Sequence, residues 1–303
     1  MFNRLVSILG EENVKKNEPM SMHTTFRIGG VADIFATVNN EEDLIKVLTY
    51  LKAENIEHFI IGNGSNLLVS DSGYRGVILQ LAGEFDTVYV KDESIIAGSG
   101  ALLAYIASMA QDKGLAGMEF ASGIPGTMGG AIVMNAGAYG GEMKDIVAGV
   151  QILWLDQDEY RIEKVSTEDM KFMYRHSILK ERDGVVLSVK LKLTKGDPAA
   201  IKALMNELND KRREKQPLNY PSAGSTFKRP EGYFAAKLIE DAGLKGYKVG
   251  QAMVSDKHAG FVVNMGGARA GEVKTLMDDV ARTVKETSGV TLEPEVILLG
   301  EFV

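Results

Sequence analysis

Residues 119–142 combine residue types that suit close contact with a large ligand. The sequence EFASGIPGTMGGAIVMNAGAYGGE has no charged side chain between its two terminal glutamates and contains seven glycines. Glycine lets the backbone approach a ligand closely and turn its N–H groups toward phosphate or ring acceptors. Tight turns between short buried strands use the same residue types, so this stretch alone leaves both interpretations open.

A second segment with phosphate-binding chemistry is GNGSN at residues 62–66. It follows an apolar run at 58–61 that reads as a strand, and its two glycines allow close backbone approach while Ser65 and Asn66 add donors. It is not the dinucleotide fingerprint, because Leu67 stands at the third glycine position, and the chain has no P-loop. A turn that simply connects two strands is the alternative interpretation.

Composition excludes several classes of function. The chain has 303 residues, enough for two domains, and its net charge of −7 argues against a nucleic-acid surface. The absence of cysteine removes disulfides and thiolate metal sites, and the four histidines show no metal-ligand spacing. The N-terminus lacks a signal peptide. We expect a cytoplasmic protein without a metal or a membrane-inserted segment, and no obligate protein partner is evident.

The elements that position these segments are helices and short strands in alternation. Asn39 or Asn40 is predicted to cap a helix whose apolar face begins at Leu44, and strands at 147–154 and 160–164 form a hairpin around residues 156–158. Pro198 begins a helix that ends in the charged run 211–215, which we interpret as a solvated C-terminus. The pattern predicts an α+β chain with a smaller α/β domain after residue 215.

Five motifs in order resemble the UDP-N-acetylenolpyruvoylglucosamine reductase family, the flavoenzymes of peptidoglycan precursor synthesis. The resemblance covers nearly the whole chain and is specific because the motifs keep their order. Within this family the chain resembles the shorter subclass, which lacks an insertion that carries a lid tyrosine. The motifs are residues 62–66, residues 122–140, Tyr174-Arg175-x-Ser177, residues 224–230 and residues 292–296.

The resemblance implies an FAD-binding fold of the p-cresol methylhydroxylase type. It implies a first FAD-binding subdomain at 1–80 with the C-terminal strand 291–303, a second at 81–214, and a substrate-binding domain at 215–290. FAD is expected to be non-covalent, with NADPH as co-substrate. The implied FAD contacts are Gly62, Asn63, Gly64, Ser65, Asn66, Ser122, Gly123, Ile124, Pro125, Gly126, Thr127, Gly129, Gly130, Asn135, Gly137, Ala138 and Tyr139.

The same resemblance implies three catalytic residues for reduction of an enolpyruvyl group. Arg175 would stabilise charge that develops on the substrate carboxylate, because a guanidinium binds two oxygens and stays charged. Glu295 would help there only as the protonated acid. Ser225 would donate a proton to the adjacent carbon, which requires assistance from its surroundings.

Substrate contacts implied by the resemblance are Lys228, Arg229, Lys245 and His258, and the substrate is UDP-N-acetylglucosamine enolpyruvate. Some relatives have asparagine at the position of Arg229 and a basic residue in the loop where this chain has residues 216–221. Two other functions fit parts of the sequence. One is another FAD oxidoreductase of the same fold, and the other is a nucleotide-sugar sensor that binds no flavin.

Overall fold

The computed structural model describes residues 1–156 and 159–302. The chain folds into two compact units, each assembled from segments that are distant in sequence. Unit 1 comprises Met1–Val14, Ala36–Gly62 and Ile78–Arg212, and unit 2 comprises Lys15–Phe35, Asn63–Val77 and Arg213–Val303. The division into 1–80 with 291–303, 81–214 and 215–290 stays a prediction.

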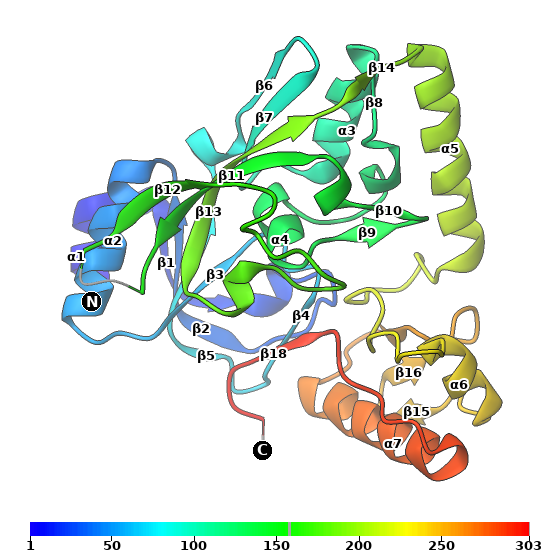
Figure 1. Cartoon of the computed structure of the whole chain (residues 1–303). Coiled ribbons are helices and arrows are strands. Elements are labelled where there is room, and N and C mark those ends of the chain that lie inside the picture. The colour runs from blue at the N-terminus through cyan, green and yellow to red at the C-terminus, as the bar shows by residue number, and fades with distance from the viewer. Residues whose placement is uncertain (157–158, 303) are drawn as a thin grey trace. The chain divides into compact units, whose positions relative to one another are not determined.

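Unit 1 is built around an antiparallel sheet of order β12-β11-β13-β7-β6 (Figure 1). The predicted hairpin is confirmed as β11 and β12, and residues 157–158 of its turn lie outside the described residues. The strands are β6 (Val88–Lys91), β7 (Ser94–Gly98), β11 (Val147–Trp154), β12 (Arg161–Val165) and β13 (Gly184–Lys192), with short pairs β8 (Leu115–Ala116) and β14 (Thr194–Lys195), and β9 (Gly137–Ala138) and β10 (Gly141–Glu142).

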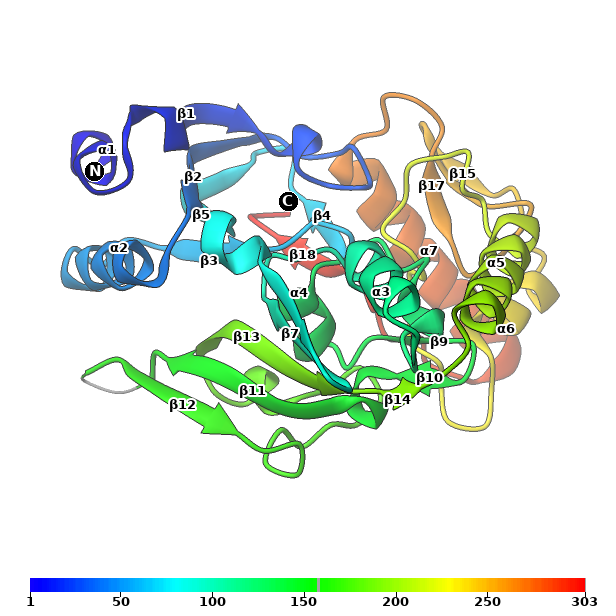
Figure 2. The same cartoon turned by 90° about the horizontal axis from the view of Figure 1, so that it is seen from above.

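The helices of unit 1 follow from local sequence signals. In α2 the side chain of Asn40 accepts from the N–H of Asp43 at 2.8 Å, which confirms the predicted cap, and Leu44 lies on the buried face. Helix α1 packs against α2 (Figure 2), and α3 and α4 share one hydrophobic core with the sheet. The helices are α1 (Phe2–Leu9), α2 (Glu41–Ala53), α3 (Leu103–Asp112), α4 (Met128–Val133) and α5 (Pro198–Lys215), whose last three residues belong to unit 2.

Unit 2 packs helices against a small antiparallel sheet of order β15-β16-β17 (Figure 1). The long helix α7 (Ala270–Ser288) ends at Gly289, whose φ of 76° suits the left-handed residue that stops a helix. A separate parallel pair joins β4 (Leu67–Val69) to β18 (Ile297–Leu299). The remaining elements are α6 (Ala235–Asp241), β15 (Lys248–Val249), β16 (Ala252–Val254) and β17 (Val262–Asn264).

Two strands contribute at least three residues to each unit. They are β2 (Val31–Val38) and β5 (Tyr74–Leu81), which lie in a sheet of order β1-β2-β5-β3 together with β1 (Val14–Pro19) and β3 (His58–Ile61). The predicted strand at 58–61 is therefore confirmed, and it leads directly into the segment 62–66.

Candidate active site

The glycine-rich stretch lies in unit 1 and contains a helix that the sequence did not predict. Helix α4 begins after Thr127, whose Oγ1 accepts from the N–H of Gly130 at 3.5 Å. Each glycine in a helix interior costs about 1 kcal/mol relative to alanine, so the helix propensity of this stretch is low. The buried side chains of Ala131 and Ile132 join the core, and this packing outweighs the glycine penalty.

The glycines of this region serve two different purposes. A Cβ on Gly62 would lie 2.3 Å from Oγ1 of Thr127, and a Cβ on Gly141 would lie 2.7 Å from the ring of Phe120. Close packing within the protein therefore requires these two glycines. Gly130 is exposed, and a Cβ there would have its nearest neighbour at 3.6 Å. Gly130 is thus a position where a ligand can approach the backbone.

Ser99 is a buried residue beside the stretch that sequence reasoning missed. Its carbonyl oxygen accepts from the N–H of Gly129 at 2.8 Å, and a Cβ on Gly129 would lie 3.0 Å from the Cβ of Ser99. Its Oγ is buried and has no hydrogen-bond partner within the described ranges. Gly129 is therefore also required by internal packing.

The end of α5 covers the loop at Ser122 and Gly123. The side-chain amide of Asn209 donates to Oγ of Ser122 at 3.2 Å, and a Cβ on Gly123 would lie 3.1 Å from Nη1 of Arg212. Arg212 is half-buried, and burial lowers the pKa of its guanidinium while the nearby Tyr139 opposes this shift. The prediction of a solvated run at 211–215 is therefore wrong for Arg212, because the i, i+3 spacing to Asn209 places both on one helix face.

Arg175 lies at the tip of a tight turn in unit 1. Met173 and His176 exchange backbone hydrogen bonds of 3.2 and 3.1 Å, and Arg175 has a φ of 54°. A residue other than glycine is uncommon in this region and costs free energy that the surroundings must supply. The side-chain amide of Asn135 donates to the carbonyl of Met173 at 3.0 Å, which fastens the turn to the glycine-rich stretch.

The charge of Arg175 reaches Glu142 at the end of that stretch. Burial opposes ionisation of Glu142, but hydrogen bonds from Lys144 and Asn135 and the positive charges of Lys144 and Arg175 outweigh it, so the pKa of Glu142 lies below its ordinary value. Unit 1 thus brings together Arg175 and the predicted flavin-binding stretch.

Unit 2 brings the Ser225 segment alongside the Glu295 segment. The N–H of Glu295 donates to the carbonyl of Thr226 at 2.8 Å, and the N–H of Lys228 donates to the carbonyl of Glu293 at 2.9 Å. Ser225 and Glu295 are half-buried, and the Oε2 atom of Glu295 is buried. Glu295 is therefore not an ordinary exposed acid on an edge strand.

The turn that follows Gly62 also lies in unit 2. Gly64 has a φ of 58°, and a Cβ there would lie 2.0 Å from the carbonyl oxygen of His23, so only glycine fits. Asn63 is exposed. The side-chain amide of Asn66 donates to the carbonyl of Glu295 at 3.0 Å, whereas the sequence suggested a donor to phosphate.

The predicted substrate-binding cations lie near the surface of unit 2 and form replaceable ion pairs. Lys228 contacts Glu293 at 3.1 Å, and Lys245 contacts Glu240 at 2.8 Å. Exposed pairs of this kind contribute about 0–1 kcal/mol, so a phosphate can compete for the lysines. The guanidinium carbon of Arg229 lies 4.9 Å from the centre of the Phe234 ring.

His258 is half-buried, and its surroundings shift the pKa of its ring. Burial lowers its pKa, the charge of Lys245 lowers it further, and its backbone hydrogen bond and Glu240 oppose the shift. The N–H of Gly260 donates to its Nδ1 at 3.1 Å, so Nε2 carries the proton of the neutral ring. His258 is therefore a neutral donor at neutral pH.

The residues present fit a flavin nucleotide. The stretch offers open backbone at Gly130 and an exposed ring at Tyr139, which is 43% exposed and is held at a φ of 54°. Taken by itself, unit 2 carries exposed Asn63 in a backbone turn of the kind that binds phosphate. These features suit an aromatic ring system joined to phosphates.

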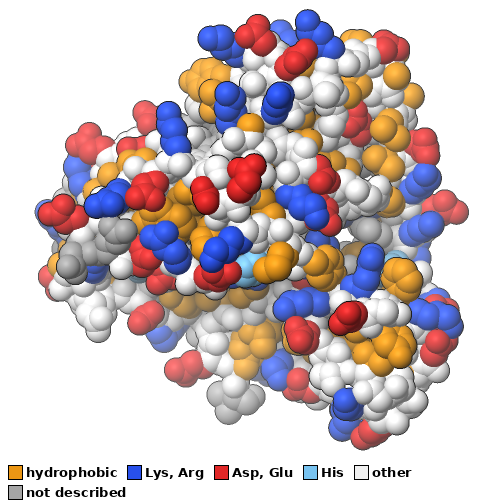
Figure 3. All heavy atoms as spheres, in the orientation of Figure 1, with side chains coloured by type: hydrophobic (Ala, Val, Ile, Leu, Met, Phe, Trp, Pro, Cys, Tyr) orange, Lys and Arg blue, Asp and Glu red, His pale blue; other side chains and the backbone are white. Residues whose placement is uncertain are grey.

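In the part of the chain that the structure describes, no group of three or more acidic or histidine side chains could hold a metal ion. Residues 1–156 and 159–302 contain no helix long and apolar enough to cross a membrane. Acidic and basic side chains are interspersed over the face shown in Figure 3, which is unlike a nucleic-acid-binding surface.

Comparisons with known proteins cover almost the whole chain. Residues 216–299 match the family model of the UDP-N-acetylenolpyruvoylglucosamine reductase C-terminal domain, and residues 32–158 match an FAD binding domain. The chain is 52% identical over 301 residues to the UDP-N-acetylenolpyruvoylglucosamine reductase of Caldanaerobacter subterraneus subsp. tengcongensis, covering 99% of this chain and 98% of the relative. It is 49% identical to that of Clostridioides difficile, with the same two coverages.

A solved structure agrees with these sequence relatives. The crystal structure of UDP-N-acetylenolpyruvylglucosamine reductase from Thermus caldophilus matches with a TM-score of 0.80 at 36% identity, covering 95% of this chain and 99% of that one. The α+β, FAD-binding fold predicted from the sequence is confirmed by this match and by the FAD-binding family model.

Proposed function

The chain belongs to the UDP-N-acetylenolpyruvoylglucosamine reductase family, and from this premise we propose that Arg175, Ser225 and Glu295 carry out its chemistry. It is an FAD-dependent oxidoreductase, and it reduces the enolpyruvyl group of UDP-N-acetylglucosamine enolpyruvate to give UDP-N-acetylmuramate for peptidoglycan synthesis. NADPH is the electron donor. The observation that carries the assignment of roles is the backbone bond between Glu295 and Thr226, which sets two candidate catalytic segments side by side.

FAD, when bound, supplies the two-electron carrier between NADPH and the substrate. We assign its non-covalent binding to the glycine-rich stretch and to residues 62–66. Gly130 leaves room for FAD beside the helix backbone. Gly62 and Gly64 allow the tight backbone turn that is assigned to contact FAD. The side chain of Asn66 is assigned a different role below.

Arg175 is proposed to bind the substrate carboxylate while negative charge builds up there. Hydride transfer to the methylene carbon of the enolpyruvyl group gives enolate character to the neighbouring carboxylate. A guanidinium offers two parallel donors to such a group and cannot lose its proton near neutral pH. The constrained turn at Arg175, with its φ of 54°, supports this role because strained backbone concentrates at functional sites.

Glu295 and Ser225 complete the proposed set. An ionised carboxylate near the enolate would repel it, so Glu295 acts as the protonated acid that donates a hydrogen bond, and burial of its Oε2 favours this neutral form. Ser225 donates the proton to the carbon beside the carboxylate. Its half-buried position limits its contact with bulk water.

The substrate nucleotide is proposed to bind unit 2 through Lys228, Arg229, Lys245 and His258. The lysines meet the diphosphate by exchanging exposed carboxylate partners for phosphate oxygens. Neutral His258 donates through Nε2. We place this substrate-binding function in residues 215–290, FAD binding in the rest of the chain, and the enzyme in the cytoplasm.

The test of this function compares NADPH oxidation by flavin-loaded protein with and without UDP-N-acetylglucosamine enolpyruvate. We expect oxidation to depend on that substrate. Equal oxidation in its absence would identify a different flavin oxidoreductase of the same fold. A purified protein that shows no flavin absorbance after incubation with FAD, yet binds the nucleotide sugar, would instead be a sensor.

A further inference from the structure

Asn66 lies where the turn at 63–66 meets β4, and its side chain contacts the Glu295 segment. The side-chain amide donates to the carbonyl oxygen of Glu295 at 3.0 Å, across 229 positions of sequence. The carbonyl of Asn66 accepts from the N–H of Ile297 at 3.0 Å. Asn66 therefore forms hydrogen bonds with two residues of the C-terminal segment, Glu295 and Ile297, within unit 2.

The strand register explains what this side chain does. In the parallel pair β4–β18, Ile297 lies opposite Leu67 and Leu299 lies opposite Val69. Extended by one step, a regular parallel ladder would direct the carbonyl of Glu295 toward the backbone N–H of Asn66. The side-chain amide of Asn66 supplies a donor to that carbonyl and so continues the ladder to Glu295.

The other side of the same residue is held as well. The N–H of Glu295 donates to the carbonyl of Thr226 at 2.8 Å, and the N–H of Thr226 donates to the carbonyl of Gly260 at 2.8 Å. Both backbone polar groups of Glu295 therefore have a partner in a different segment. These two hydrogen bonds fix the backbone of Glu295 and therefore the position from which its carboxyl side chain extends.

We propose that Asn66 is a positioning residue for Glu295. The side chain of Asn66 fixes the backbone of Glu295 and does not contact FAD. FAD binding by residues 63–66 is then left to their backbone and to the other side chains of the turn. This inference rests on the proposed role of Glu295. It links a cofactor-binding turn directly to the group that binds the substrate carboxylate.

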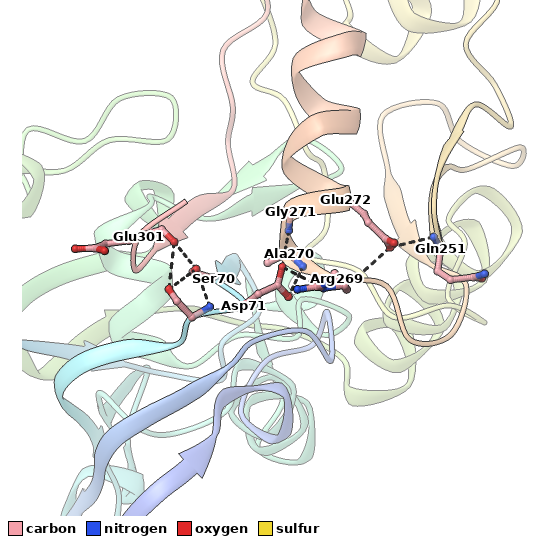
Figure 4. A network of polar contacts seen from close by, with 9 residues as sticks. Ser70, Asp71, Gln251, Arg269, Ala270, Gly271, Glu272 and Glu301 are labelled. Carbon is pink, nitrogen blue, oxygen red and sulfur yellow. Dashed lines mark hydrogen bonds and ion pairs between the residues drawn. The ribbon is translucent and has the colours of Figure 1, made fainter. Parts of the chain in front are cut away.

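The far end of β4 offers a matched control. The hydroxyl of Ser70 donates to the carbonyl of Glu301, and the carboxylate of Asp71 accepts from the N–H groups of Ala270 and Gly271 at 2.9 Å each (Figure 4). Ser70 thus makes the same kind of contact, from a side chain to a backbone carbonyl of the C-terminal segment, without touching Glu295. Ser70→Ala removes this side-chain link to the C-terminal segment.

The experiment measures four quantities for Asn66→Ala, Asn66→Asp and Ser70→Ala in the flavin-loaded full chain. They are the Kd for FAD, the calorimetric Kd for UDP-N-acetylglucosamine enolpyruvate, the rate of flavin reduction by NADPH, and the rate of its reoxidation by substrate. Asn66→Asp keeps the size of the side chain, replaces the amide donor by an acceptor and adds a negative charge, so it also breaks the bond to the carbonyl of Glu295 and provides the measurement if Asn66→Ala does not fold.

We expect both Asn66 variants to slow reoxidation about tenfold or more, because small misplacements of reacting groups have effects of this size. The Kd for FAD and the rate of reduction should stay within about twofold of the wild type, and Ser70→Ala should leave reoxidation unchanged. Loss of FAD with normal reoxidation per bound flavin would overturn the proposal and make Asn66 a cofactor donor. Equal slowing in Ser70→Ala would also overturn it.

Glu295→Ala, measured in parallel, separates two kinds of failure. If Glu295→Ala leaves reoxidation intact, the proposed role of Glu295 is wrong. If Glu295→Ala slows reoxidation but neither Asn66 variant does, the function stands and the positioning inference is wrong.

Discussion

The N–H of Glu295 donates to the carbonyl of Thr226 at 2.8 Å, so a residue near the C-terminus is fixed beside the segment that carries Ser225. The bridge between Phe227 and Pro294 continues the same pairing. Two candidate groups that lie 70 positions apart in sequence are thereby held in one register within unit 2.

Gly130→Val should prevent FAD retention while the protein still folds. A Cβ at Gly130 would make an ordinary van der Waals contact, 3.6 Å from Oγ1 of Thr127, so the added bulk should disturb the protein itself little and a closely bound ligand more. The measurements are flavin absorbance after purification and the midpoint of thermal unfolding. The comparison is Gly129→Val, which should lower the midpoint of thermal unfolding because its Cβ would lie 3.0 Å from that of Ser99. A fully yellow Gly130→Val protein would contradict the assigned contact.

Arg175→Lys should slow flavin reoxidation by the substrate by about tenfold or more, because lysine keeps the charge but loses the paired donors. Reduction of the flavin by NADPH should change little. Arg182→Lys is the control, since Arg182 pairs with Asp156 at 2.8 Å on the exposed surface. If Arg175→Lys and Arg182→Lys react at the same rate, Arg175 does not bind the developing charge.

Much of this arrangement was predictable from sequence, and the exceptions have physical reasons. The cap at Asn40 was readable because it depends on neighbouring residues. Helix α4 could not be predicted from local sequence, because tertiary packing of Ile132 outweighs the low helix propensity of glycine. The side-chain bond from Asn66 to Glu295 joins residues 229 positions apart, and no local pattern encodes such a contact.

His258 should make stability depend on pH. Burial lowers its pKa below the ordinary value of 6.5, so the unfolded chain takes up a proton before the folded protein does. The free energy of unfolding should therefore fall as pH decreases through about 6.5, and His258→Gln should reduce that fall. Thermal unfolding between about pH 7.5 and about pH 5.5 measures it, with His58→Gln as the control histidine. Identical pH dependences in wild type and His258→Gln would contradict this expectation.

Ser99→Ala should leave stability unchanged or raise it. The buried hydroxyl has no hydrogen-bond partner among the described residues, and an unmet polar group costs about 1–3 kcal/mol. Ser177→Ala is the opposite case, because its buried hydroxyl donates to the carbonyl of Val133 at 2.9 Å, and its loss should cost about 1 kcal/mol. Urea unfolding of both variants gives the comparison. A large destabilisation by Ser99→Ala would show that the hydroxyl has a partner such as a bound water.

The most direct test of the proposed chemistry is a two-step rapid-mixing measurement on Ser225→Ala. The flavin-loaded protein is first reduced with NADPH and is then mixed with UDP-N-acetylglucosamine enolpyruvate while flavin absorbance is recorded. Reduction should proceed at nearly the wild-type rate, and reoxidation should be slower by about 10²-fold or more, since general acid catalysis contributes about that much. Equal slowing of both steps, or normal reoxidation, would contradict the role of Ser225 as proton donor.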